Sequence, residues 1–378
     1  MKLSTILTGS LALATLLTMT GCEDTPEQES PITKKLKVAL GSSLYSNTDL
    51  SQNRTMSCAT CHSLEHGLID DRTTSMTHGA SLGDDGVSIG DRNAPTAAYA
   101  AFSPNFHFDS DEGLYIGGQF LDGRAADLKA QAKGPFLNPL EMGMADESAV
   151  VERVKEDPIT VAQMIAVYGL EIFNDDVEAY DAIADSIAAF EKSEVFSPFD
   201  SKYDNYLAGS ATLTAQEEEG RLLFEGKAMC VACHPAVTED GSHPLFTDFS
   251  YDNLGVPANA DLRAMNGVST IDNGLGKEVN EAELEGAFKV SSLRNIAVTG
   301  PYMHNGQFKD LKTVVHFYNT RDTGGINPET NAAWQTGEVD ANKNVDELGD
   351  LGLSDQEEDA IVAFMKTLTD KKFEHLLP

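Results

Sequence analysis

The chain has 378 residues, and its 60 acidic and 27 basic side chains give a formal net charge of −33 at pH 7. This length favours two domains of ordinary size over one. A surface with this charge repels nucleic acid and anionic lipid and attracts cationic partners, so no nucleic-acid partner is expected; acidic surfaces are also typical of proteins from saline habitats.

The first 22 residues have the pattern of a lipoprotein-type signal peptide. One lysine precedes an apolar stretch from Ile6 to Leu17, which is too short and too weakly flanked for a stable membrane span. Gly21 and Cys22 resemble a lipoprotein cleavage point, so we expect cleavage before Cys22 and its lipidation, with plain secretion as the alternative. Residues 23–35 are polar and contain proline, which predicts a tether without a core.

Four of the five cysteines lie in two C-x-x-C-H motifs, "SCATCHS" at 57–63 and "MCVACHP" at 229–235. This motif is typical of covalent c-type haem attachment, in which both sulfurs bond the porphyrin and the histidine binds iron. A thioredoxin-like redox pair needs no adjacent histidine, and zinc pairs normally lie closer in sequence. Export agrees with c-type haem, whose attachment is completed outside the cytoplasm. The attachment residues are Cys58, Cys61, Cys230 and Cys233, and the predicted iron ligands are His62 and His234.

Apolar periodicity predicts a mainly α-helical chain. Helices are expected within 176–195, 214–229 and 354–370, and the last two begin with capping boxes, Thr214 with Glu217 and Ser354 with Glu357. Helix-breaking residues at 196–202 predict a boundary between domains 36–198 and 199–378. The stretches 78–119 and 236–285 are rich in Gly, Asn and Asp without a strong period, so we expect ordered loops that wrap around haem.

Three further motifs follow in order along the chain: "RNAPT" at 92–96, "GGQFLDGRAADLKAQAKGPFLNPLEMG" at 117–143 and "SLRNIAVTGPYMHNGQF" at 292–308. With the haem motifs they resemble the bacterial di-haem cytochrome c peroxidases and their MauG-like relatives. The resemblance implies two cytochrome c-like helical domains, each with one covalent haem, and a calcium ion between the haems. The N-terminal haem would meet hydrogen peroxide and the C-terminal haem would relay electrons. It also implies a periplasmic protein with a small cytochrome c or cupredoxin as electron donor, and it leaves a homodimer open.

The resemblance assigns several residues to the peroxide pocket. Glu141 matches the carboxylate of that pocket, where breaking the O–O bond of peroxide requires a proton to move from the near to the far oxygen. Gln131 matches an amide that orients the bound peroxide. His78 matches the histidine that caps the peroxidatic iron at rest in many peroxidases, and the alternative is a loop histidine without metal.

Other matches concern the calcium ion, the haem propionates and the surroundings of the second haem. Calcium in the family is held by an Asn side chain and backbone carbonyls, which match Asn93, Thr299 and Pro301; such hard oxygen donors suit calcium. The guanidinium groups of Arg124 and Arg294 could pair with haem propionates. His304 matches a histidine near the second haem, where we expect a supporting residue rather than an iron ligand.

The sequence departs from the peroxidase pattern at two positions. Electron-transferring members usually supply a Met thioether to the second iron, which raises its potential, and this chain has Tyr318 there. A tyrosine at this position resembles the MauG-like branch, in which a phenolate ligand stabilises ferric iron, lowers its potential and favours storage of oxidising equivalents. The alternative is that Tyr318 only packs a helix and that His316, or no side chain, binds the second iron. Leu121 replaces the usual Trp, whose ring lies between the haems and helps to carry electrons. Electrons would then have to tunnel directly from haem to haem, or another aromatic residue such as Tyr115 would have to substitute for the Trp.

These features predict a di-haem peroxidase that reduces hydrogen peroxide with electrons from a small redox protein. The alternatives are a MauG-like oxidase that uses peroxide to modify a protein or organic substrate, for which Tyr318 is the main argument, and a non-enzymatic di-haem electron carrier.

Overall fold

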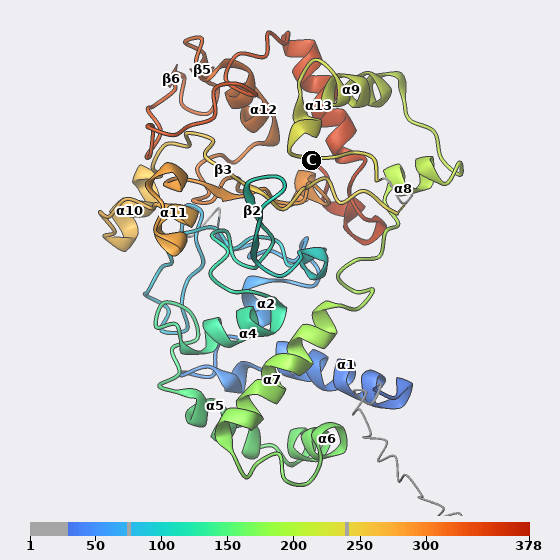
Figure 1. Ribbon diagram of the computed structural model, residues 1–378, viewed down its shortest axis with the longest axis vertical. Helices are drawn as coiled ribbons and strands as arrows, with labels where there is room; N and C mark the ends of the chain where they lie inside the picture. Colours follow the sequence, from blue (N-terminus) through green and yellow to red (C-terminus); the bar gives the residue numbers. More distant parts are fainter. Residues whose placement is uncertain (1–28, 74–76, 239–241) are drawn as a thin grey trace, which may run out of the picture.

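The computed structural model describes residues 29–73, 77–238 and 242–378 (Figure 1). The predicted signal peptide and Cys22 therefore lie outside the described residues. Within these ranges no helix combines the length and apolar character needed to cross a bilayer. The first helix begins earlier than expected, inside the predicted tether, because Ser30 caps it by accepting from the Thr33 amide and Pro31 is preset for the first turn.

The chain is mainly α-helical, as its apolar periodicity predicts. Among the described residues the α-helices are α1 (Pro31–Tyr45), α2 (Cys58–Cys61), α4 (Leu128–Leu137), α5 (Glu147–Lys155), α6 (Pro158–Tyr168), α7 (Asp176–Glu191), α8 (Lys202–Leu207), α9 (Ala215–Glu225), α10 (Ala260–Asn266), α11 (Gly274–Val279), α12 (Leu311–Thr320) and α13 (Asp355–Lys366). The strands are β1 (His107–Asp109), β2 (Leu114–Ile116), β3 (Tyr251–Asp252), β4 (Phe288–Lys289), β5 (Ile326–Asn327) and β6 (Ala332–Ala333), paired β1–β2, β3–β4 and β5–β6, each antiparallel.

One closely packed helix pair organises each half of the molecule (Figure 1). In the N-terminal half α1 crosses α7, and in the C-terminal half α9 crosses α13. A glycine permits each crossing: a Cβ on Gly41 would lie 1.9 Å from the Ser186 carbonyl oxygen, and one on Gly220 would lie 1.8 Å from the Ala360 carbonyl oxygen. Any larger residue would force the helices apart.

Each helix pair carries its own hydrophobic core. The first core is built from Leu44, Val151, Ile183 and Ile187 with their neighbours, and the C-terminal Phe373 packs into it. The second core is an aromatic cluster centred on residues from α8, α9, α13 and the loop after the second haem motif: Tyr203, Phe224, Phe246 and Phe364. Residues 192–201, with neither helix nor strand, connect the halves, and the exact domain boundary stays a prediction.

The predicted helices form with the expected caps, since Thr214 and Ser354 begin α9 and α13 as capping boxes. The prediction of loops was wrong for part of 236–285, which contains α10 and α11. These helices have seven and six residues, too few to show a helical period, and α10 forms because Asn259 caps it and Gly267 ends it in a left-handed conformation. The stretch 78–119 contains the β1–β2 hairpin, with Phe108 opposite Tyr115.

Candidate haem centres

Both motif histidines are oriented in the same way. His62 Nδ1 lies 3.2 Å from the Leu68 carbonyl oxygen, and His234 Nδ1 lies 2.7 Å from the Phe246 carbonyl oxygen. Burial lowers the pKa of both imidazoles and favours the neutral form. A neutral ring that donates from Nδ1 keeps Nε2 as a free lone pair, which is the state an iron ligand needs.

The two carbonyl acceptors belong to unusual backbone positions. Leu68 and Phe246 are fully buried and have positive φ angles of 60° and 54°. A bulky residue rarely adopts this conformation without a tertiary reason. Here the left-handed turn places a carbonyl against the imidazole six residues after His62 and twelve residues after His234.

Glu141 lies near the first haem motif. Burial is the main cause of the raised pKa of the Cys58 and Cys61 thiols, and the negative charge of Glu141 adds to it at both cysteines, so the carboxylate is near enough to act on both thiols. Asn138 Nδ2 donates to Glu141 Oε1 at 2.8 Å and fixes the carboxyl group. Burial raises the pKa of Glu141, against the opposing effects of Asn138 and of the positive charge on Arg124. The site thus holds a half-buried carboxyl group that can carry a proton.

For Gln131 and His78, the two other residues predicted for this pocket, the described residues show no hydrogen bond or ion pair with Glu141 or with the first haem motif. Gln131 is half-buried in α4, one turn before Pro135, whose carbonyl accepts from the Met142 amide beside Glu141. His78 has a positive φ of 57°, and its Nδ1 makes no hydrogen bond within the described residues and lies 3.9 Å from Asp261 of α10. The roles of Gln131 and His78 stay predictions.

A cavity of about 320 Å³ adjoins the second haem motif. It is lined by both attachment cysteines, Cys230 and Cys233, by His234 and by Tyr318 of α12. Burial raises the pKa of the Tyr318 phenol. The side chain of His316 instead places Nδ1 2.8 Å from Glu358 of α13. The structure therefore brings Tyr318, and not His316, to the cavity, while Tyr318 as an iron ligand stays a prediction.

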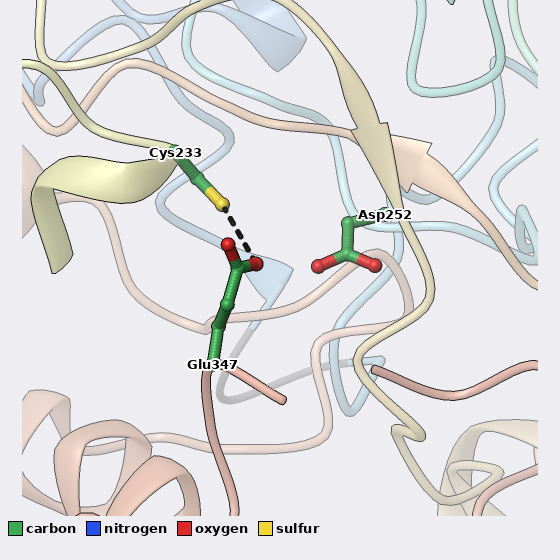
Figure 2. A group of neighbouring side chains, drawn as sticks. All are labelled: Cys233, Asp252 and Glu347. Atoms are coloured by element: carbon green, nitrogen blue, oxygen red, sulfur yellow. Dashed lines mark hydrogen bonds between the residues drawn. The ribbon is translucent and has the colours of Figure 1, made fainter. Parts of the chain in front are cut away.

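Two carboxylates stand beside Cys233 (Figure 2). Glu347 Oε2 lies 3.9 Å from Cys233 Sγ, and Asn344 Nδ2 bridges Glu347 and Asp252 at 2.8 and 2.7 Å. Burial raises the pKa of Asp252. A thiolate and two carboxylates could hold a cation, but a thioether sulfur carries no charge and is a weak ligand. If haem is attached to Cys233, no thiolate remains to bind a cation, and Asp252 and Glu347 are then two neighbouring acids at the edge of the second centre.

The predicted calcium residues lie together at the cavity wall. Asn93, Thr299 and Pro301 all line it, and the Asn93 side-chain amide donates to the Pro301 carbonyl at 2.6 Å. The donor set of one amide oxygen and backbone carbonyls fits a hard cation such as calcium. His304 is buried there and stacks on Phe288 with ring centroids 3.7 Å apart. Burial lowers the pKa of His304 to about 3, which suits a neutral supporting residue.

The predicted propionate partners differ from what the structure shows. The Arg294 guanidinium is buried on Asp204, with two contacts of 2.9 Å, and its Nε donates to the Pro244 carbonyl. Its faces lie on the rings of Tyr99 and Phe199, and the side chain is only 1% exposed, so the prediction of a propionate partner for Arg294 was wrong. Arg294 instead joins α8 to the segment around Pro244. Arg124 pairs with Asp122 at 2.8 Å and covers Phe120.

Lys289 is a cavity residue that the sequence analysis missed. Its Nζ donates to the Gly118 carbonyl at 2.6 Å, and burial lowers its pKa to about 8. The sequence gives no signal for it, because a single lysine outside any recognised motif has no distinctive pattern. Leu121 also lines the cavity, whereas Tyr115 is not among its lining residues and lies on the β1–β2 hairpin. Tyr115 as a substitute for the usual Trp stays a prediction.

Two helical halves, each with a C-x-x-C-H motif and an oriented histidine, define a di-haem protein of the c type. A family model described as di-haem cytochrome c peroxidase matches residues 35–212. The chain is 44% identical over 375 residues to the methylamine utilization protein MauG of Paracoccus denitrificans, covering 97% of this chain and 96% of that one.

It is also 34% identical over 304 residues to the cytochrome c peroxidase Ccp of Escherichia coli, covering 78% of this chain and 57% of that one. The crystal structure of the diheme peroxidase BthA from Burkholderia thailandensis matches with a TM-score of 0.82 at 28% identity, over 93% of this chain and 89% of that one. The chain belongs to the di-haem cytochrome c peroxidase and MauG-like family. It is accordingly a di-haem oxidoreductase, and the predicted fold class is confirmed.

Proposed function

We propose that the protein is a peroxidase that reduces hydrogen peroxide to two molecules of water, using two protons and two electrons from a small cytochrome c or cupredoxin. The observation that carries this proposal is Glu141, a half-buried carboxyl group beside Cys58 and Cys61 whose pKa is raised by burial. A surface acid of this type would be ionised and solvated. A carboxyl group that can carry a proton beside a haem suits proton transfer between the two oxygens of peroxide.

At the first centre, Cys58, Cys61 and His62 would hold the haem. The haem supplies an iron that binds peroxide and exchanges electrons with it. Glu141 takes a proton from the near peroxide oxygen and returns it to the far oxygen, which leaves as water. Asn138 keeps Glu141 in place through its hydrogen bond to Oε1, so the carboxyl group does not have to be ordered during the reaction.

At the second centre, Cys230, Cys233 and His234 would hold the electron-relay haem, and Tyr318 would be a further protein ligand of its iron. Lys289, a cation in the cavity wall, would pair with a carboxylate of that haem. Asn93, Thr299 and Pro301 would hold calcium on the wall shared by the two halves. Cys22 would be lipidated after export, which places the enzyme on a periplasmic membrane surface.

A MauG-like oxidase is the second candidate, and Tyr318 in the second cavity favours it. An anionic phenolate stabilises oxidised iron and lowers its potential, which favours storage of oxidising equivalents over acceptance of electrons from a cytochrome. The similarity to the Paracoccus denitrificans protein supports the same reading. Both candidates begin with the same reaction of peroxide at the first centre.

Spectra of the calcium-loaded holoprotein would separate the candidates. Optical and EPR spectra are recorded before and after one-electron reduction, and peroxide is added to each form. Rapid turnover with a reduced cytochrome only after half-reduction supports the peroxidase, and the His78 cap would then appear as a low-spin to high-spin change of the first haem. A persistent oxidised species formed from the fully ferric protein, with a tyrosinate signature that Tyr318→Phe removes, supports the MauG-like oxidase instead.

A further inference from the structure

The β1–β2 hairpin packs its inner face against β3 and forms a small cluster of its own. This cluster contains Phe106, Tyr115 and Tyr251 with the apolar residues Leu275 and Ala287. The Phe106 and Tyr115 rings are stacked, with centroids 5.5 Å apart and planes within 8°. Phe106 meets Tyr251 edge to face at 6.0 Å. Three aromatic rings therefore run in contact from the hairpin to the base of β3.

Only one segment of backbone separates this row of rings from the second-haem cavity. Gln119, Phe120 and Leu121 of that segment line the cavity, while the glycines on either side of them face the aromatic row. Tyr251 donates from its hydroxyl to the Gly117 carbonyl at 2.6 Å, and a Cβ on Gly123 would lie 2.4 Å from that hydroxyl and 2.6 Å from the Phe106 ring. The next residue of β3, Asp252, already lines the cavity.

The outer end of the row carries a phenol with a proton acceptor. Tyr115 is half-exposed, and its hydroxyl donates to Glu281 Oε1 at 2.7 Å. This hydrogen bond to a carboxylate raises the pKa of Tyr115. Tyrosine can lose an electron at moderate potential only if its proton leaves at the same time, so a hydrogen-bonded carboxylate is the partner that such a step requires. By contrast, the Tyr251 hydroxyl donates to a carbonyl, which is a poor base.

We propose that Tyr115 and Glu281 form a redox-active site at the surface, connected to the second haem centre through Phe106 and Tyr251. This inference rests on the proposed reaction with hydrogen peroxide, which supplies the oxidant. Tyr115 gives one electron inward to the oxidised haem centre, and its phenolic proton moves to Glu281, so that a neutral tyrosyl radical and a protonated carboxyl group result. An external donor returns one electron to Tyr115, and Glu281 returns the proton.

The donor that fits this site is a cationic one-electron donor too large to enter the haem cavity. The exposed side chain of Phe108, which is paired with Tyr115 across the hairpin and packs on its ring, gives the donor an apolar contact. Three acidic residues lie on the hairpin, Asp109, Asp111 and Glu112, and a fourth, Glu281, accepts from Tyr115. Negative charge at this end of the row of rings steers positively charged proteins and repels anionic ones.

Freeze-quench EPR of the holoprotein after addition of peroxide, without any electron donor, tests the proposal. We expect a tyrosyl signal that is narrowed by ring-deuterated tyrosine, disappears in Tyr115→Phe and falls about tenfold or more in Glu281→Gln. Tyr206→Phe is the matched control, because Tyr206 is also a partly buried tyrosine stacked on another aromatic ring, Tyr203, but it lies on α8, away from the hairpin cluster, and should leave the signal unchanged. Oxidation of a reduced basic cytochrome c should slow in parallel with the loss of signal.

The outcomes separate this inference from the proposed function. If peroxide changes the haem spectra of every variant while the tyrosyl signal survives in Tyr115→Phe, the peroxide reaction stands and the Tyr115 site is refuted. If peroxide leaves the haem spectra of the wild-type protein unchanged, the proposed function fails and the inference fails with it. Glu281→Gln keeps Tyr115 and alters only an exposed side chain, so a folding defect in Tyr115→Phe would not hide the result.

Discussion

Replacement of Glu141 by glutamine tests the proposed chemistry most directly. The amide keeps the size of the side chain and can still bond Asn138 after a flip, but it cannot accept or return a proton. General acid–base assistance by a positioned side chain contributes about 10²–10⁴-fold, which corresponds to roughly 3–5 kcal/mol of activation free energy. We therefore expect the second-order rate of the reaction with peroxide to fall by two to four orders of magnitude, about 10²–10⁴-fold.

The assay is stopped-flow absorbance of the haem bands after mixing with peroxide, with the haem spectra of the resting variant as a check on folding. Glu191→Gln is the matched control. Glu191 is a second buried carboxyl group that acts electrostatically on Cys58, but it lies on α7 in the core of the N-terminal half. A Glu141→Gln protein that reacts at the wild-type rate, or an equal loss in Glu191→Gln, would refute the assignment of Glu141 as the specific proton carrier.

Three further predictions concern the second haem, the buried acid of α7 and the helix crossing. Tyr318→Met should shift the midpoint potential of the second haem to a more positive value in spectroelectrochemistry, because axial ligands set haem potentials over about 0.8 V and a thioether favours the reduced iron; Tyr206→Met should not shift it. Burial raises the pKa of Glu191 to about 8, so the native state binds the Glu191 proton more tightly than the unfolded chain does. The protonated carboxyl group therefore contributes to the free energy of unfolding fully below about pH 4.5, and this contribution is lost as the pH rises toward 8. Denaturant titration should show this loss, at most about 5 kcal/mol, and a flatter pH dependence in Glu191→Gln. Gly220→Ala should destabilise the C-terminal half by about 1–3 kcal/mol or more and lower Tm, because its Cβ would meet the Ala360 carbonyl at 1.8 Å, whereas Gly90→Ala, with no atom nearer than 3.8 Å, should leave Tm nearly unchanged.

Sequence patterns predicted those features that depend on neighbouring residues. The caps at Thr214 and Ser354 are built from residues three positions apart, and both form as expected. The short helices α10 and α11 were not predicted, because one or two helical turns are too short to show an apolar period. The Arg294 prediction failed because a guanidinium suits any carboxylate, and only the folded chain shows that Asp204, ninety positions away, occupies it.

Several functional contacts could not be predicted because they join distant segments or depend on backbone conformation. The carbonyls that orient His62 and His234 belong to Leu68 and Phe246, and any residue type offers a carbonyl. Lys289 reaches the cavity only because β4 pairs with β3, and Tyr115 meets Glu281 across the β1–β2 cluster.

The sequence by itself determined the two haem attachments, the histidine next to each and the helical class of the fold. These follow from local rules, since thioether attachment needs two cysteines at fixed spacing and a helix needs its cap and its apolar stripe. Tertiary structure alone decided that Tyr318 lines the second cavity, that Arg294 is held by Asp204, and that Tyr115 lies at the surface with a proton acceptor. Burial and partner choice in those cases depend on which segments pack together, and that packing sets the pKa and the reach of each side chain.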